Sequence, residues 1–237
     1  MHVGAIRLLK TLPHPCGYFA ARTARNLVID PLARDLPEVF PLALERGFRR
    51  AGGHIYRPAC IGCQACVAAR IPLADFRPNR AQRRCIARNA DVLTTLETPQ
   101  ENAQVYALYH RYLRARHRGG GMDEGSRDDF ERFLTAPWSP TRFLMLHLDG
   151  QLVGVAVTDV TALGWSAVYT FFAPELASRG LGTLAILRQI EHARSAGAAH
   201  LYLGYWIEEH PKMRYKNRFA PLELLRGTRW ERAAPAR

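Results

Sequence analysis

Apolar and polar residues follow their clearest pattern in the second half of the chain. Residues 142–148 read RFLMLHL, an apolar run typical of a buried strand, and Asp149-Gly150 comes directly after it. This dipeptide is a strong signal for a two-residue hairpin turn. The pattern therefore predicts a returning strand over QLVGVAVTDV at 151–160 and a third strand over WSAVYTFF at 165–172.

A helix and another strand are predicted next along the chain. Two glycines, Gly180 and Gly182, introduce residues 183–196, where apolar side chains recur at helical spacing. Gly197 is well placed to end that helix. Residues 201–203 then form a short apolar run typical of a buried strand. The predicted order is hairpin, strand, glycine turn, helix and strand.

The first half of the chain predicts further helices. Residues 35–51 carry apolar side chains at helical spacing, with Asp35 as the expected N-cap, Glu38 reaching back to it, and Gly52-Gly53 as the stop. The last turn of this helix would hold Arg46, Arg49 and Arg50. Two more helices are predicted, at 102–117 and within 122–138.

The composition indicates a globular protein with a strong excess of positive charge. The chain has 237 residues, is 48% hydrophobic and carries a net charge of +12. Residues 1–95 hold 15 Lys and Arg against 6 Asp and Glu, so most of the excess lies in the first part of the chain. Such an excess indicates a polyanionic partner. With no apolar run of membrane-spanning length and no signal peptide pattern, we expect no membrane association and a cytoplasmic location.

One segment concentrates this charge on a single helix face. Five arginines between residues 77 and 88 recur every three or four positions. Like charges on one face repel each other, so an anionic partner is favoured over a merely solvated face. Together with a lysine further along the chain, the set predicted to bind this anionic partner is Arg77, Arg80, Arg83, Arg84, Arg88 and Lys212.

The cysteines leave two interpretations open. Cys60, Cys63 and Cys66 form CxxCxxC, a spacing that suits a metal or an iron–sulfur cluster, with Cys16 or Cys85 as the fourth ligand. The alternative is a set of small buried thiols in a tight loop. Because a second paired knuckle is missing, the prediction adopted is that the protein holds no metal and no cofactor.

Several long motifs resemble those of the aminoacyl-tRNA–protein transferases. The resemblance covers nearly the whole chain, from about Cys16 to Trp230. Its motifs are CGYF at 16–19, GFRRAGGHIYRPACIGCQACVAARIP at 47–72, RYLRARH at 111–117, AVYTFF at 167–172, and LYLGYWI with KMRYK within 201–216. Two departures stand out: Phe19 replaces a cysteine of the eukaryotic relatives, and Leu184 breaks the acetyl-CoA signature of GNAT enzymes.

The resemblance implies both a fold and an activity. The fold is α+β, a GNAT-like acyltransferase fold at 96–237 with an additional N-terminal lobe at 1–95. The activity is transfer of leucine from leucyl-tRNA to proteins whose first residue is Asp or Glu, which marks them for degradation. The resemblance thus implies that the anionic partner of the basic set at 77–88 and 212 is the tRNA. Two alternatives are an N-acetyltransferase that uses acetyl-CoA and a non-catalytic RNA-binding module.

Ester aminolysis defines the residue types that this activity needs. The attacking amine must lose a proton, to Asp159 or His117, and the oxyanion needs a donor such as Tyr169 or Tyr202. The acidic side chain of the acceptor needs a cation, ideally a bidentate arginine, and the leucyl side chain needs an apolar pocket, for which Tyr169, Phe171 and Trp206 are candidates. The predicted catalytic residues are Asp159, Tyr169 and Tyr202, and the predicted substrate-binding residues are Arg22, Arg25, Tyr56, Arg57, Arg70, Trp206 and Lys216.

Overall fold

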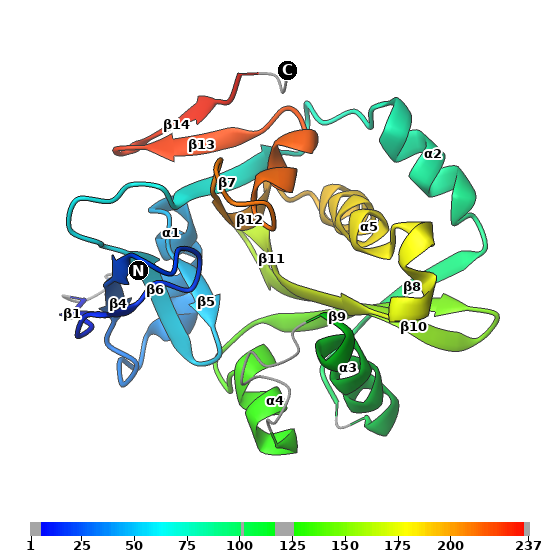
Figure 1. Ribbon diagram of the computed structural model, residues 1–237, viewed down its shortest axis with the longest axis horizontal. Coiled ribbons are helices and arrows are strands. Elements are labelled where there is room, and N and C mark those ends of the chain that lie inside the picture. The colour runs from blue at the N-terminus through cyan, green and yellow to red at the C-terminus, as the bar shows by residue number, and fades with distance from the viewer. Residues whose placement is uncertain (1–5, 101, 117–125, 235–237) are drawn as a thin grey trace.

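A mixed sheet of eight strands forms the centre of the computed structural model, which describes residues 6–100, 102–116 and 126–234 (Figure 1). Its strands, in spatial order, are β14 (Arg229–Arg232), β13 (Glu223–Arg226), β7 (Val67–Pro72), β12 (His200–Trp206), β11 (Gly164–Phe172), β10 (Gln151–Thr161), β9 (Thr141–Leu148) and β8 (Val92–Glu97). All neighbours are antiparallel except β11 and β12. The predicted hairpin is confirmed, because Asp149 and Gly150, at φ 49° and 77°, join β9 to β10.

Helices cover both faces of this sheet. On one face lie α3 (Ala103–Arg116) and α4 (Arg127–Leu134), and on the other lie α5 (Leu181–Ser195) and α2 (Arg80–Arg88), which packs on α5 (Figure 1). Two 3₁₀ segments, η1 (Pro174–Arg179) and η2 (Arg214–Arg218), precede α5 and follow β12. Gly180, at φ 73°, provides the turn into α5, as the glycine pattern predicted. The order of strands and helix is that of the GNAT-like acyltransferase fold, so the predicted fold class is confirmed.

A smaller sheet packs beside the large one. Its order is β1 (Leu8–Lys10), β4 (Asn26–Ile29), β6 (His54–Pro58) and β5 (Arg49–Ala51), and a two-stranded ladder of β2 (His14–Pro15) and β3 (Thr23–Ala24) lies next to it. Helix α1 (Leu36–Glu45) covers it with the buried side chains of Phe40 and Leu44. Strands β7 and β8 belong to the large sheet, so the predicted division at residue 95 does not coincide with the boundary between the two sheets.

The predicted helix over residues 35–51 is wrong in its second half. Helix α1 ends at Glu45, and Gly47 adopts a left-handed φ of 77° that turns the chain. Residues 49–51 then form β5, and Gly52-Gly53 joins β5 to β6 in a hairpin instead of ending a helix. Asp35 is at the N-cap position, but its side chain makes no capping hydrogen bond.

The large sheet opens between β11 and β12. These parallel strands pair only at Trp165 with Leu201 and at Ser166 with Tyr202, and they diverge beyond these pairs. Val168 is the extra residue of a bulge in β11, because Tyr169 pairs with Val157 while Ala167 pairs with the next residue of β10. The sheet is therefore open where the remaining lengths of β11 and β12 face each other.

Candidate functional site

Strand β5 directs two neighbouring arginines to opposite places, because successive side chains of a strand point to opposite faces. Arg50 enters the core and reaches Asp159 on β10. Arg49 points into the opening between β11 and β12. Its Nη2 donates a hydrogen bond to the carbonyl oxygen of Val168, at 3.2 Å, in the bulge of β11. On the other side of the opening, a methyl group on Gly204 would lie 3.3 Å from Nη1 of Arg49.

A second cation, Lys216, lies close to Arg49. Its side chain is only 4% exposed, and its Nζ donates a hydrogen bond to the carbonyl oxygen of Tyr205 at 2.6 Å. Burial, together with the positive charge of Arg49, lowers the pKa of Lys216 from its ordinary value of 10.5 to about 7. At neutral pH this amine is therefore partly uncharged and able to accept a proton. We call Arg49 and Lys216 the cation pair of the opening.

Tyrosines surround the cation pair. The hydroxyls of Tyr18, Tyr56, Tyr205 and Tyr215 lie near enough to Arg49 to raise its pKa against the opposing effect of burial. The rings of Tyr56 and Tyr205 lie 6.3 Å apart, and the Tyr205 hydroxyl donates to the carbonyl oxygens of Gly47 and Tyr56, both at 3.1 Å. Within the part of the chain that the structure describes, no carboxylate lies within ion-pair distance of either cation.

A cavity of about 670 Å³ lies beside the end of β12. Trp206, Val67 and Ile61 supply its apolar lining, and Arg22 and Glu209 its polar lining. The predicted substrate-binding residue Trp206 therefore lines a real cavity, where its Nε1 donates to the carbonyl oxygen of Arg214 at 3.3 Å.

Asp159, predicted as the proton acceptor, is completely buried in an ion pair. Arg50 donates to both of its carboxylate oxygens at 2.8 Å, and the hydroxyl of Thr141 donates to Oδ1 at 2.7 Å. Neither oxygen is left for a substrate amine, so this position favours a structural role for Asp159 over the predicted catalytic one. The other candidate base, His117, lies outside the described residues.

Arg70 and Tyr202 belong to a second polar network. Arg70 is 8% exposed and pairs with Glu45 at 2.9 Å and with Glu223 at 2.8 Å. The hydroxyl of Tyr202 donates to Glu45, and burial followed by this bond raises its pKa. Trp230 covers the guanidinium of Arg70, with its ring centroid 4.3 Å away. Because both carboxylates neutralise Arg70, this arginine is a poor candidate for binding an acidic substrate. The hydroxyl proton of Tyr202 is already donated to Glu45, so Tyr202 is a poor candidate for donating to an oxyanion.

Tyr169 keeps an unused hydroxyl. It follows the bulge of β11 and packs among Tyr109, Phe133 and the completely buried Phe171. Its hydroxyl is buried and has no hydrogen-bond partner among the described residues, and burial raises its pKa. Of the two predicted oxyanion donors, Tyr169 is therefore the one with a free proton to donate.

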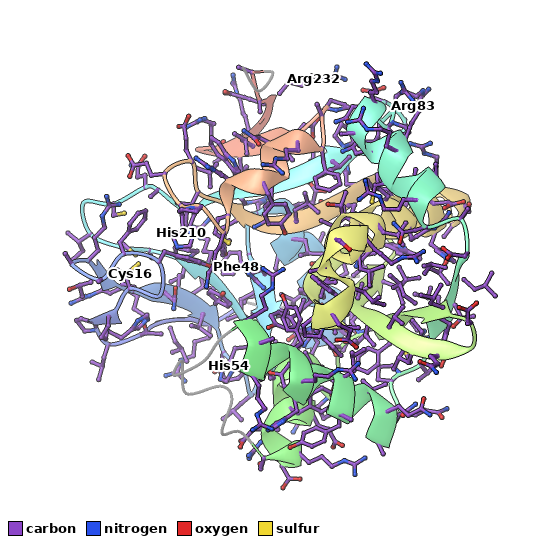
Figure 2. All side chains as sticks on the ribbon, turned by 45° about the vertical axis from the view of Figure 1, so that its right-hand side comes forward. Cys16, Phe48, His54, Arg83, His210 and Arg232 are labelled. Carbon is purple, nitrogen blue, oxygen red and sulfur yellow. The ribbon has the colours of Figure 1, made fainter. Side chains whose placement is uncertain are left out.

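The other predicted substrate-binding arginines lie in the N-terminal part of the chain, Arg22 and Arg25 on either side of β3 and Arg57 in β6. Arg22 is exposed, stacks over Phe19 at 3.9 Å and pairs with Glu209 at 3.5 Å. Arg57 is exposed and lies over Phe48 at 5.0 Å. Arg25 is half-buried, and its carbonyl oxygen accepts from the thiol of Cys60 at 3.6 Å. Figure 2 places Cys16 and His210 on the same side of the molecule.

The predicted tRNA-binding arginines form an exposed surface. Helix α2 contains no acidic residue, and Figure 2 shows Arg83 on the side of the molecule opposite to Cys16. Arg88 donates to the carbonyl oxygen of Ser178 at 2.7 Å, which ties α2 to the turn before α5. The exposed members of this set are Arg77, Arg80, Arg83, Arg84 and Arg88, and Lys212 is exposed in the turn before η2.

Four of the cysteines gather in one place. Burial, and then the nearby thiols of Cys16, Cys60 and Cys63, raise the pKa of Cys66 to about 11. Cys85 lies elsewhere, with its Sγ 3.6 Å from the carbonyl oxygen of Gly180. Within the described ranges, no group of three or more His, Cys, Asp or Glu side chains has a geometry that could hold a metal ion.

The split between β11 and β12, with α5 packed on both strands, defines an acyltransferase-type fold. Comparison with known families specifies this further: residues 14–84 match the N terminus and residues 104–226 the C terminus of the arginine-tRNA-protein transferases. The chain belongs to this family, as its motifs indicated.

Individual relatives agree with this assignment. The chain is 56% identical, over 95% of its length and 92% of the relative, to the aspartate/glutamate leucyltransferase of Stenotrophomonas maltophilia (strain K279a). It is 49% identical to that of Xylella fastidiosa (strain 9a5c), over 95% of this chain and 91% of the relative. A solved domain (DUF2156) of a protein described as a lysylphosphatidylglycerol synthetase, from Agrobacterium fabrum, has the same fold. Its TM-score is 0.52 at 16% identity, over 81% of this chain and 66% of that structure. No described helix has the length and apolar character needed to cross a membrane.

Proposed function

We propose that this protein transfers leucine from leucyl-tRNA to the N-terminal Asp or Glu of proteins and thereby marks them for degradation. One structural observation carries the proposal. The opening between β11 and β12 holds two cations, the half-buried Arg49 and the buried Lys216, with no carboxylate partner among the described residues. A negatively charged acceptor would supply the missing anion. Relatives that are 48–56% identical are named aspartate/glutamate leucyltransferases, which supports the same acceptors and donor.

The reaction is aminolysis of an ester. The α-amine of the acceptor attacks the leucyl carbonyl carbon, a C–N bond forms, and the C–O bond to the terminal ribose of the tRNA breaks. An α-amine has a pKa of about 7.7–8.0, so part of it is neutral in a cell and positioning provides much of the rate enhancement. The amine must lose one proton and the ribose oxygen must gain one.

Lys216 is the proton acceptor that we propose, in place of Asp159. With a pKa of about 7, its amine takes up the proton of the attacking nitrogen and can return it to the leaving ribose oxygen. The free hydroxyl of Tyr169 is our proposed donor to the oxyanion. The cavity beside Trp206 is the proposed place for the leucyl side chain.

The tRNA would reach the opening along α2. Its arginines are exposed, and Arg88 lies against Ser178 in the turn before α5, where enzymes with this fold hold the phosphates of their acyl donors. Exposed arginines contact phosphates in a sequence-independent way, which suits a backbone approach. A reaction that consumes charged tRNA is consistent with a cytoplasmic location.

Transfer of labelled leucine tests the proposal. The protein is mixed with charged tRNA and peptides that begin with Asp, Glu or Ala, and a parallel reaction contains arginyl-tRNA. We expect leucine on the Asp and Glu peptides and little on the Ala peptide. Peptides that stay unmodified with both charged tRNAs would refute an aminoacyl transferase, and transfer from arginyl-tRNA alone would refute leucine as the group transferred.

A further inference from the structure

Three arginines with little or partial exposure, Arg49, Arg50 and Arg70, differ in the groups that they bond to. Arg50 is neutralised by Asp159, at 2.8 Å, and Arg70 by Glu45 and Glu223, at 2.9 and 2.8 Å. Among the described residues, the side chain of Arg49 bonds only to the carbonyl oxygen of Val168, at 3.2 Å. A guanidinium has five N–H donors and a fixed positive charge, so Arg49 keeps both donors and charge for another group.

The surroundings of Arg49 select the kind of anion. Lys216, whose pKa the charge of Arg49 lowers, has the same sign, and the other groups that act on Arg49 are the tyrosines Tyr18, Tyr56, Tyr205 and Tyr215. The guanidinium is confined on the side of β12, since a methyl group on Gly204 would lie 3.3 Å from Nη1. A planar carboxylate on a short side chain can approach such a guanidinium from the open side and pair with it through two parallel bonds. Bulkier backbone phosphates suit the exposed arginines of α2.

We propose that Arg49 binds the side-chain carboxylate of the acceptor's N-terminal Asp or Glu and so determines the acceptor specificity. The inference rests on the proposed function, since it assigns one of the two substrates to a residue. In such a residue the carboxylate and the reacting α-amine are only a few bonds apart. Holding the carboxylate at Arg49 therefore brings the amine to the same opening, beside Lys216.

The backbone supports this position of Arg49. Gly47 turns the chain out of α1, and β5 then aligns with β6 through three registered pairs, Arg49 with Tyr56 among them. The residue at the partner position, Tyr56, contributes one wall of the site. Gly204, at φ 72°, leaves the room that the guanidinium occupies.

Two variants, Arg49→Gln and Arg49→Lys, test the proposal with peptides that begin with Asp or with its uncharged isostere Asn. We expect Arg49→Gln to lower kcat/KM for the Asp peptide by about a hundredfold, because one partner of a buried charge pair is removed. It should also abolish the preference for Asp over Asn. Arg49→Lys keeps the charge but not the fork, so it should retain part of that preference. The control is Arg46→Gln, an exposed arginine three residues earlier, which should behave as the unaltered protein.

Calorimetry with the same peptides in the absence of tRNA separates this proposal from the proposed function. Tighter binding of the Asp peptide by the unaltered protein, lost in Arg49→Gln, supports the role of Arg49 even if no transfer occurs. Transfer to Asp peptides with the full preference over Asn retained in Arg49→Gln overturns the role of Arg49 and leaves the proposed function intact. Circular dichroism verifies that each variant is folded. If Arg49→Gln is unfolded, the preference of Arg49→Lys for the Asp peptide over the Asn peptide tests the role of Arg49 instead.

Discussion

The two faces of strand β5 carry the same residue type into opposite electrostatic surroundings. Arg50 meets the carboxylate of Asp159 with two bonds of 2.8 Å, and its guanidinium also donates to three further acceptors, on Gly52, Leu134 and Thr141. Arg49, one residue earlier, meets a carbonyl oxygen and the cation Lys216. The first arrangement is complete without any ligand, whereas the second has no carboxylate partner among the described residues and, on our proposal, acquires one when an acidic acceptor binds.

We infer from this difference that the charge of Arg50 stabilises the fold and that the charge of Arg49 serves substrate binding. A buried ion pair with all its hydrogen bonds made adds little net stability, but the loss of one partner leaves an uncompensated charge. A pair of like charges is unfavourable in the free protein and becomes favourable with an anionic substrate. Variants of Arg50 should therefore lose stability in unfolding measurements, whereas variants of Arg49 should lose activity and specificity in transfer assays.

Breaking the Arg50–Asp159 pair should give the largest effect on stability. Arg50→Met leaves the carboxylate of Asp159 buried without its partner, which should cost roughly 3–5 kcal/mol of unfolding free energy in urea titrations. The double variant Arg50→Met with Asp159→Leu should recover much of that loss. A large loss of transfer in Asp159→Asn at unchanged stability would instead return Asp159 to the catalytic role that the sequence predicted.

Titration of Lys216 should give the next largest effect. Its folded pKa of about 7 lies below its ordinary 10.5, so between these values the unfolded chain binds a proton that the folded protein does not. Stability should therefore rise with pH above about 7, by up to about 1.4 kcal/mol per pH unit. The charged and titratable groups that face Lys216 are Arg49, Cys66 and Tyr215.

Lys216→Met should remove this slope between pH 7 and 9, a range below the ordinary pKa of tyrosine. Urea unfolding of both proteins at several pH values measures the difference. Arg49→Gln is the matched control, because it removes the like charge and should raise the pKa of Lys216 while keeping the amine. Parallel stability curves for the unaltered protein and Lys216→Met would contradict a lowered pKa.

The strands and helix of the large sheet were predicted from the sequence more accurately than the residues at the opening between β11 and β12. The hairpin over 141–161 and the helix over 181–195 follow from local signals, namely Asp149-Gly150 and a regular helical spacing. Arg49 was missed because residues 35–51 were assigned to one helix, which made it a cation near a helix end. The signal that could have shown the break was Gly47, a common helix stop, followed by a hairpin at Gly52-Gly53.

Long-range partners explain the remaining differences. Asp159 looked available because the chain alone does not reveal that Arg50, 109 positions away, pairs with it. Arg70 looked like a free cation for the same reason, since Glu223 lies 153 positions away. The basic face of α2 was found because helical periodicity alone places its arginines together.

Gly47→Ala should have an intermediate effect. A left-handed φ of 77° costs a non-glycine residue about 1–2 kcal/mol, and its new methyl group would meet Leu225 at 2.6 Å. Because Gly47 starts the turn into β5, transfer to Asp peptides should fall as well. Gly53→Ala, where no heavy atom lies within 4 Å of the new methyl group, should change stability by less than about 0.5 kcal/mol in thermal unfolding.

Charge reversal on α2 should have the smallest effect on stability and a specific effect on tRNA. Arg83→Glu with Arg84→Glu changes two exposed side chains, so unfolding free energy should stay within about 0.5 kcal/mol. If each arginine meets a phosphate, the plot of log binding constant against log salt should become shallower by roughly two. Reversing Lys10, at the end of β1, and Arg34, before α1, changes the net charge equally at two exposed positions and should leave that slope nearly unchanged. Equal slopes for both double variants would place the tRNA on another surface, because a path along α2 requires the two sets of charges to differ.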